Sequence, residues 1–219
     1  HGFEIILIDQ RNHGKSFHSD QFDYETMSED LKNFLDEKKI QKVSLIGHSM
    51  GGKTIMNFIL NYPSYANKVI VVDILPKAYN NDYEKIFNAF SKMDLNNLKS
   101  RKQIDEYFSG FFSDYTFVSF LSKNINRDSN GNFKIKFNLN SIKSNILKIT
   151  SAIKIDRVFN EDILFMKGEY SNYIDNQGLF EAKKSFPKLS LVTIENSSHW
   201  IHYENQKKFL LETLNYLRT

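Results

Sequence analysis

Cysteine is absent from the 219 residues, and this absence excludes several kinds of chemistry. Without thiols the chain has no disulfide framework, no thiolate metal site and no cysteine nucleophile. A reducing compartment is therefore compatible with the sequence, and we expect a cytoplasmic protein. The chain begins at His1 rather than at a methionine, so the alternative of a removed targeting peptide stays open.

Strong net charge and long apolar runs are also lacking. The formal net charge is +3, and the basic residues are scattered rather than gathered on one stretch, so nothing indicates nucleic-acid binding. The best apolar run, Val69 to Leu75, is interrupted by Asp73 and is too short for a transmembrane segment. We expect a soluble protein that acts on a small molecule, and the sequence leaves its oligomeric state open.

Short apolar runs alternate with helical periodicity, which is typical of βαβ units. Such units predict an α/β fold with a mostly parallel sheet that helices cover on both faces. The predicted strands are 4–9, 42–46, 69–72, 163–166 and 189–194. The predicted helices are 24–35 behind an Asp23 N-cap, 50–61 ending before Pro63, 179–186, and a last helix that carries Phe209 to Leu217.

The alternation is lost between residues 75 and 160, where the chain is rich in aromatic residues and of mixed helical character. We interpret this stretch as an inserted helical lid. The α/β core is then formed by residues 1–74 and 161–219. An aromatic lid favours an apolar ligand, and Phe111 and Phe112 are the candidate substrate-binding residues.

Ser49 is the candidate nucleophile, because Gly47-His48-Ser49-Met50-Gly51 fits the pattern G-x-S-x-G. The pattern alone arises by chance roughly once in fifteen chains of this length, so its context decides. It lies between a predicted strand and a predicted helix, where glycines permit the sharp turn that exposes the serine hydroxyl. The Met50 amide, at the start of the helix, is the candidate oxyanion donor.

His199 is the candidate base, because the histidine of such enzymes follows the last strand of the sheet. His202 is the competing residue, but it belongs to the beginning of the final helix. A neutral imidazole accepts the serine proton and later returns it to the leaving group. His13, His18 and His48 are interpreted as supports of backbone and loops.

Four segments together resemble the small bacterial esterases of the YbfF type and their mitochondrial relatives, within the α/β-hydrolase superfamily. The segments are Asp9–Gly14, Gly47–Lys53, Val72–Ile74 followed by Pro76, and His199–His202. The resemblance implies hydrolysis of carboxylic esters or acyl thioesters without a metal or an organic cofactor. It also implies that Arg11 and His13 are scaffold residues. Ser198 stands where that family usually has glycine.

Asp73 is the preferred acid of the triad. Most α/β-hydrolases place the acid in a G-x-x-D pattern after the strand that follows the lid, and here that position holds Ser171. Glu169 and Asp175 are displaced candidates in the same loop. The resemblance to the YbfF type favours Asp73, which ends the strand before the lid.

These residues together predict a serine hydrolase that works through a covalent acyl-enzyme. Two alternatives stay open. One is hydrolysis of a carbon–carbon bond or a lactone with the same triad, and the other is a hydrolase-fold binding protein without turnover.

The beginning of the sequence carries a further expectation. In this superfamily the second oxyanion donor comes from a loop, often marked His-Gly, that precedes a helix and the next strand. His1-Gly2-Phe3 imitates that loop but directly adjoins the predicted strand 4–9. We therefore expect the first strands and the oxyanion loop to lie upstream of residue 1, and the chain by itself to be impaired although its triad is complete.

Overall fold

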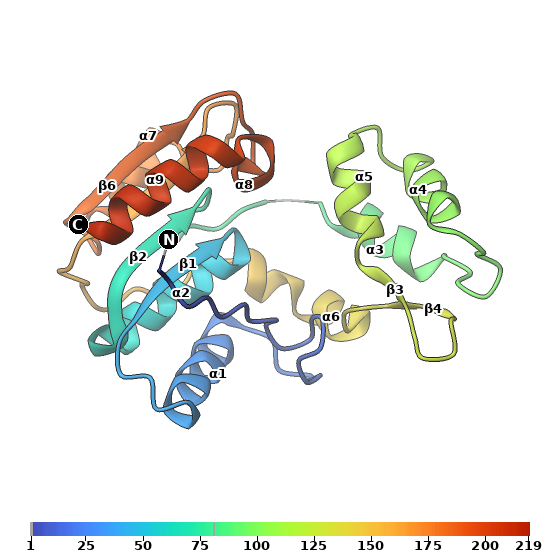
Figure 1. The fold of residues 1–219 in the computed structure, drawn as a ribbon, viewed down its shortest axis with the longest axis horizontal. Coiled ribbons are helices and arrows are strands. Elements are labelled where there is room, and N and C mark those ends of the chain that lie inside the picture. The colour runs from blue at the N-terminus through green and yellow to red at the C-terminus, as the bar shows by residue number, and fades with distance from the viewer. Residues whose placement is uncertain (1, 81) are drawn as a thin grey trace. The chain divides into compact units, whose positions relative to one another are not determined.

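The computed structural model describes residues 2–80 and 82–219 (Figure 1). The chain forms two compact units, which are described separately. Residues 23–79 and 148–219 form the sheet unit, and residues 1–22 and 80–147 form the aromatic unit.

The sheet unit is built on four parallel strands in the order β1-β2-β5-β6. Their bounds are Val43–His48 for β1, Ala66–Val72 for β2, Ile163–Gly168 for β5 and Leu189–Ile194 for β6. In the register, His48 lies opposite Val72, and Val72 lies opposite Met166. All four strands were expected from the sequence. The strands β2 and β5 are almost continuously apolar because both faces of the sheet are covered.

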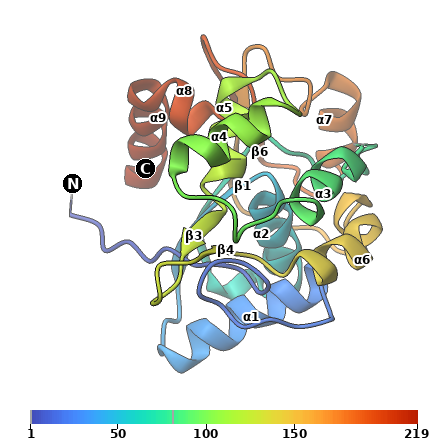
Figure 2. The same ribbon diagram turned by 90° about the vertical axis from the view of Figure 1, so that its right-hand side faces the viewer.

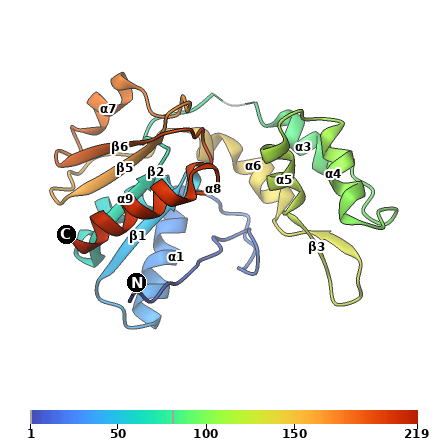
Figure 3. The same cartoon turned by 45° about the horizontal axis from the view of Figure 1, so that its top comes forward.

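Helices α2 (Met50–Asn61) and α9 (Gln206–Arg218) cover the two faces of this sheet (Figures 1 and 3). Ile70 and Val72 belong to the cluster against which α9 packs, whereas Val71 faces Gly52 of α2. Alternate residues of β2 therefore serve opposite faces, as the period of a strand requires. Such a sheet presents its chemistry at the carboxyl ends of its strands.

Helix α1 (Tyr24–Glu37) begins where the sequence predicts. The Asp23 side chain accepts the Thr26 amide at 2.9 Å, and the Thr26 hydroxyl lies 3.4 Å from the Asp23 amide, so the two residues form a capping box. The other helices of the unit are η1 (Pro63–Tyr65), α7 (Asn176–Ala182) and α8 (Ile201–Glu204). The predicted helix 179–186 thus begins earlier and ends four residues sooner than expected.

The aromatic unit packs three short helices and a hairpin around a core of their own (Figure 2). The elements are α3 (Glu84–Ser91), α4 (Arg101–Ser109), α5 (Tyr115–Ser122), β3 (Ile125–Arg127) and β4 (Phe133–Ile135). Ile104, Phe108 and Ile125 are fully buried in this core. Helix α6 (Leu139–Thr150) continues from this unit into the sheet unit.

The segment after residue 9 is an ordered loop of the aromatic unit, organised by Asn12. The Asn12 side chain is fully buried; it donates to the Ser141 hydroxyl at 3.1 Å and accepts the Ser19 amide at 2.8 Å. The buried Arg11 donates to the Gln21 carbonyl at 3.0 Å. These contacts tie the loop together and agree with a scaffold role for this segment.

The predicted strand 4–9 is wrong. Residues 4–9 have no regular secondary structure, and Ile5 and Leu7 are 75% and 90% exposed. A strand exists through the hydrogen-bonded ladder that it shares with a neighbour, and within the described residues no ladder includes this segment. An apolar run alone therefore predicts a tendency to form a strand, but it does not supply the neighbouring strand that completes the ladder.

Candidate active site

Ser49 lies on a sharp turn between β1 and α2. Its backbone has φ 52° and ψ −118°, and its amide donates to the Val72 carbonyl at 3.0 Å. A Cβ at Gly47 would lie 2.4 Å from the Gly51 carbonyl oxygen, and one at Gly52 would lie 2.5 Å from Ile74. Only glycine fits these two positions. Gly47 is the first glycine of the sequence pattern, so that part of the pattern reflects a steric requirement of the turn, whereas Gly52 lies one residue beyond the pattern and lets α2 approach the segment after β2.

Asp73 follows the neighbouring strand β2 and is completely buried. Its Oδ1 accepts the Gly168 amide at 3.0 Å, and its Oδ2 accepts the Ser171 hydroxyl and is 2.8 Å from His199 Nδ1. The residue adopts φ 51°, and its amide donates to the Met166 carbonyl at 2.8 Å. Several donors thus converge on a carboxyl group that has no access to water, as buried polar groups require.

His199 lies in the loop after β6, with a side chain that is 18% exposed. Because a carboxylate accepts hydrogen bonds, the contact with Asp73 places the ring proton on Nδ1. Nε2 then presents its lone pair as a base. Ser49, Asp73 and His199 all come from the carboxyl edge of one sheet.

The alternative acids and the alternative base have other partners. Glu169 accepts the Asn196 amide at 2.8 Å, whereas Asp175 caps α7 and forms an ion pair with Lys77. His202 lies in α8, and burial lowers its pKa. The geometry therefore favours Asp73 and His199 as the interacting pair.

Three neighbours of this pair were not singled out for the site from the sequence. Ser171 holds the position where the G-x-x-D pattern has its acid, and here its hydroxyl donates to Asp73. A Cβ at Gly168 would lie 1.9 Å from the Ser198 carbonyl oxygen, so glycine lets the loop after β5 approach the histidine loop. Tyr173 stacks on the His199 ring. The sequence offered a signal only for Gly168 and Ser171, through their places in that pattern.

His48 supports the histidine loop. Burial, with His199 as the next cause, lowers the pKa of His48 to about 3, so its ring is neutral. Its Nε2 lies 2.8 Å from the His199 carbonyl oxygen and therefore acts as the donor. The residue before Ser49 thus fixes the backbone of the candidate base.

Lys53 is a buried lysine in the first turn after the elbow and is only 1% exposed. Its Nζ donates to the Ser151 carbonyl at 2.6 Å and lies 5.4 Å and 5.1 Å from the ring centres of Tyr24 and Tyr79. Burial lowers the pKa of Lys53 from 10.5 to about 8. One carbonyl and two aromatic faces thus offset only part of the cost of burying an ammonium group.

We expect Lys53 to make the free energy of unfolding depend on pH. Between pH 8 and 10.5 the unfolded chain keeps the lysine proton and the folded chain releases it, so stability rises with pH in this window. Between pH 7 and pH 10 the free energy of unfolding of wild type should rise by about 2 kcal/mol more than that of Lys53→Met. Denaturant unfolding at several pH values measures this gain, and parallel curves would contradict it. Lys102→Met is the control, because that side chain is 84% exposed.

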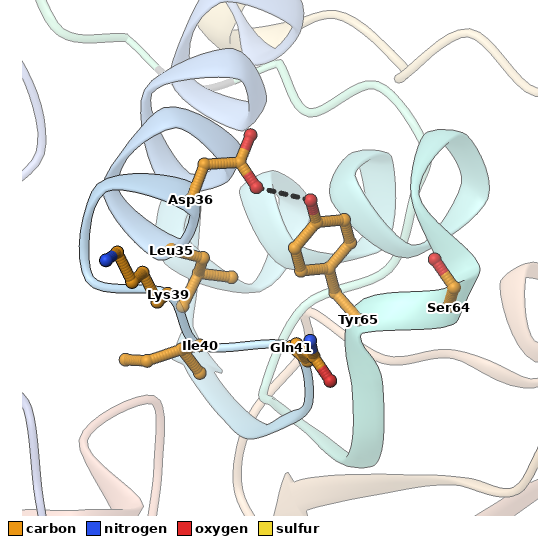
Figure 4. A pocket seen from close by; sticks show the side chains of 7 residues that line it. All are labelled: Leu35, Asp36, Lys39, Ile40, Gln41, Ser64 and Tyr65. Atoms are coloured by element: carbon orange, nitrogen blue, oxygen red, sulfur yellow. Dashed lines mark hydrogen bonds between the residues drawn. The ribbon is translucent and has the colours of Figure 1, made fainter.

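A separate cavity of about 390 Å³ lies beside the amino ends of β1 and β2 (Figure 4). Its walls come from the end of α1, the segment before β1 and η1, and the Tyr65 hydroxyl donates to Asp36 across it. These segments precede the strands, whereas the candidate triad follows them. The cavity is therefore not the place of the predicted chemistry.

The other candidate residues have simple positions. Met50 is the first residue of α2, directly after Ser49. Phe111 and Phe112 are half-buried against the core of the aromatic unit.

Over residues 2–80 and 82–219, no group of three or more His, Cys, Asp or Glu side chains could hold a metal ion. In the same part of the chain, no helix is long and apolar enough to cross a membrane.

Known proteins are similar to this chain in sequence and in fold. A putative esterase/lipase of Haemophilus influenzae is 34% identical over 203 residues, which is 92% of this chain and 69% of that protein. Esterase YbfF of Escherichia coli is 28% identical, over 97% of this chain and 82% of its own length. A solved marine microorganism esterase is 40% identical with a TM-score of 0.91, covering 96% of this chain and 83% of the other. The family model of the alpha/beta hydrolase fold matches residues 1–206. The chain therefore belongs to the α/β-hydrolase family and has relatives of the YbfF type.

Proposed function

We propose that the chain is a serine esterase that cleaves carboxylic esters or acyl thioesters. The observation that carries this proposal is the 2.8 Å contact of His199 Nδ1 with the buried Asp73, at the sheet edge where Ser49 occupies the nucleophile elbow. The names of the relatives, an esterase/lipase and two esterases, support the same chemistry.

The reaction follows from the roles of these groups. His199 Nε2 takes the Ser49 hydroxyl proton while the serine oxygen attacks the carbonyl carbon, and the Met50 amide donates to the oxyanion. The imidazolium then protonates the leaving oxygen or sulfur as its bond to the acyl carbon breaks, so the alcohol or thiol departs and the acyl-serine forms. Water attacks the acyl carbon of that intermediate while His199 takes its proton; the imidazolium then returns the proton to the Ser49 oxygen as the bond to the acyl group breaks, which releases the acid and restores the serine hydroxyl. Asp73 keeps the imidazole in the required tautomer throughout.

A fluorophosphonate probe combined with aryl esters tests this proposal. We expect stoichiometric labelling of Ser49, located by peptide mass spectrometry, and hydrolysis of aryl esters with a preference along the acyl-length series. A protein that binds esters but neither reacts with the probe nor turns over would be a hydrolase-fold binding protein. Turnover of lactones or carbon–carbon substrates without turnover of esters would favour the other chemistry of this triad.

We further propose that residues 75–160 act as a lid whose Phe111 and Phe112 contact the acyl group. Both rings are half-buried, so each leaves apolar surface beside the core of its unit. Replacing either with alanine should lower the rate on long acyl chains about tenfold and leave acetate esters nearly unchanged, because a buried methylene is worth about 0.8 kcal/mol. Values of kcat/KM across the series measure this selectivity.

Phe108→Ala is the matched control, since that ring is fully buried in the same core. Its loss should destabilise the unit by about 3 to 5 kcal/mol and reduce activity on all chain lengths alike. If Phe111→Ala and Phe112→Ala behave in the same uniform way, both rings are packing residues and the acyl-binding role is wrong.

A further inference from the structure

Tyr173 lies against the face of the candidate base. It belongs to the loop between β5 and α7, and its ring is stacked on the His199 imidazole with centroids 4.0 Å apart and planes 20° apart. The neighbouring ring of His48 is farther away and more tilted, at 4.5 Å and 44°. The tyrosine is thus the aromatic ring that lies parallel to the imidazole.

The backbone of Tyr173 is fixed at both ends of the residue. Its amide donates to the Ser171 hydroxyl oxygen at 3.2 Å, and that hydroxyl in turn donates to Asp73. Its carbonyl accepts the Tyr79 hydroxyl at 2.8 Å, and the same hydroxyl oxygen accepts the Leu75 amide at 2.8 Å. Both attachments lead to the segment that carries the acid, so one frame places Asp73 and the Tyr173 ring around His199.

An aromatic face attracts a cation far more strongly than it attracts a neutral ring. In the proposed reaction the imidazole is neutral before attack and becomes an imidazolium while the serine proton is transferred. A ring stacked at 4.0 Å therefore favours the charged state more than the resting state. Only such a difference in stabilisation raises kcat.

We propose that Tyr173 is a positioning residue that holds the plane of the His199 ring and stabilises the positive charge on it during acyl transfer. This inference rests on the proposed function, because it assigns a role to His199 in the same reaction. It requires the aromatic face of Tyr173 and does not require its hydroxyl group.

Two substitutions separate the ring face from the hydroxyl. Tyr173→Leu should lower kcat for an aryl ester about tenfold with KM changed less than twofold, because leucine offers the imidazolium no aromatic face. Tyr173→Phe, which keeps the ring, should retain at least half of kcat. If Tyr173→Leu melts well below wild type, Tyr173→Met takes its place, since it fills the site without an aromatic face.

The matched control is Tyr170→Leu in the same loop, where the tyrosine is 63% exposed, and it should behave as wild type. The rate of fluorophosphonate labelling at Ser49 distinguishes a failure of the proposed function from a failure of the role assigned to Tyr173. A wild type that is not labelled contradicts the proposed function. If wild type is labelled and Tyr173→Leu is labelled at the same rate as wild type, only the role of Tyr173 is overturned. The same conclusion follows if Tyr173→Leu and Tyr173→Phe lose kcat equally.

Discussion

Replacing Ser49 with alanine is expected to lower kcat for ester hydrolysis by about 10⁶-fold, the scale of loss on deleting the nucleophile of such triads. The hydroxyl oxygen is the atom that forms the covalent bond, and the protein offers the acyl group no second nucleophile in the proposed mechanism. Alanine keeps the Cβ of serine, so the turn at φ 52° carries the same strain in both proteins. Steady-state kinetics and thermal unfolding on the same preparations measure the effect.

Ser64→Ala is the control for Ser49→Ala. Ser64 is exposed and lies in the cavity at the opposite edge of the sheet, so its loss should change neither kcat nor labelling by the fluorophosphonate (Figure 4). Residual turnover of Ser49→Ala within tenfold of wild type would show that another residue is the nucleophile.

Asp73→Asn is expected to lower kcat by about 10⁴-fold. The Gly168 amide donates to Oδ1, which must therefore remain an oxygen in the variant. The amide nitrogen of asparagine then takes the place of Oδ2 and faces His199 Nδ1 as a donor. This contact moves the ring proton to Nε2, where the imidazole no longer accepts the proton of Ser49.

Glu169→Gln is the matched control for the acid, because it makes the same chemical change in the loop that contains the alternative candidates. Its side chain accepts the Asn196 amide through an oxygen that glutamine also has, so kcat should stay within about threefold of wild type. Since Asp73 also joins two loops, thermal unfolding must accompany the kinetics. The reverse order of the two effects would assign the acid to the later loop.

The sequence predicted the parts of the fold whose causes are local. Asp23 with Thr26 starts α1, and Pro63 follows the end of α2 closely, because caps and proline act within a few residues. The segment 4–9 has an equally apolar pattern but no regular structure, since a strand depends on a distant partner. An apolar pattern therefore indicates that a segment tends to be buried, whereas the pairing of strands is seen only in the three-dimensional structure.

The candidate site shows the same division. Gly47, Ser49 and the neighbouring glycines are adjacent in sequence, so a motif was sufficient to predict the turn. The contacts around Asp73 join residues that are 98 and 126 positions apart, to Ser171 and His199 respectively. The stacking of Tyr173 likewise depends on two loops that meet only in the folded chain. No pattern along the sequence could predict it.

The left-handed backbone at the ends of three strands has a consequence for engineering the protein. Ser49, Asp73 and Asn196 have φ values of 52°, 51° and 52°, a conformation that costs residues other than glycine about 1 to 3 kcal/mol each. Glycine would relieve this cost at all three positions, but it would remove the proposed nucleophile at Ser49 and the carboxylate that orients His199 at Asp73. Thermostability and turnover therefore compete at two of these turns, and Asn196 is the one where a more heat-resistant variant need not sacrifice activity.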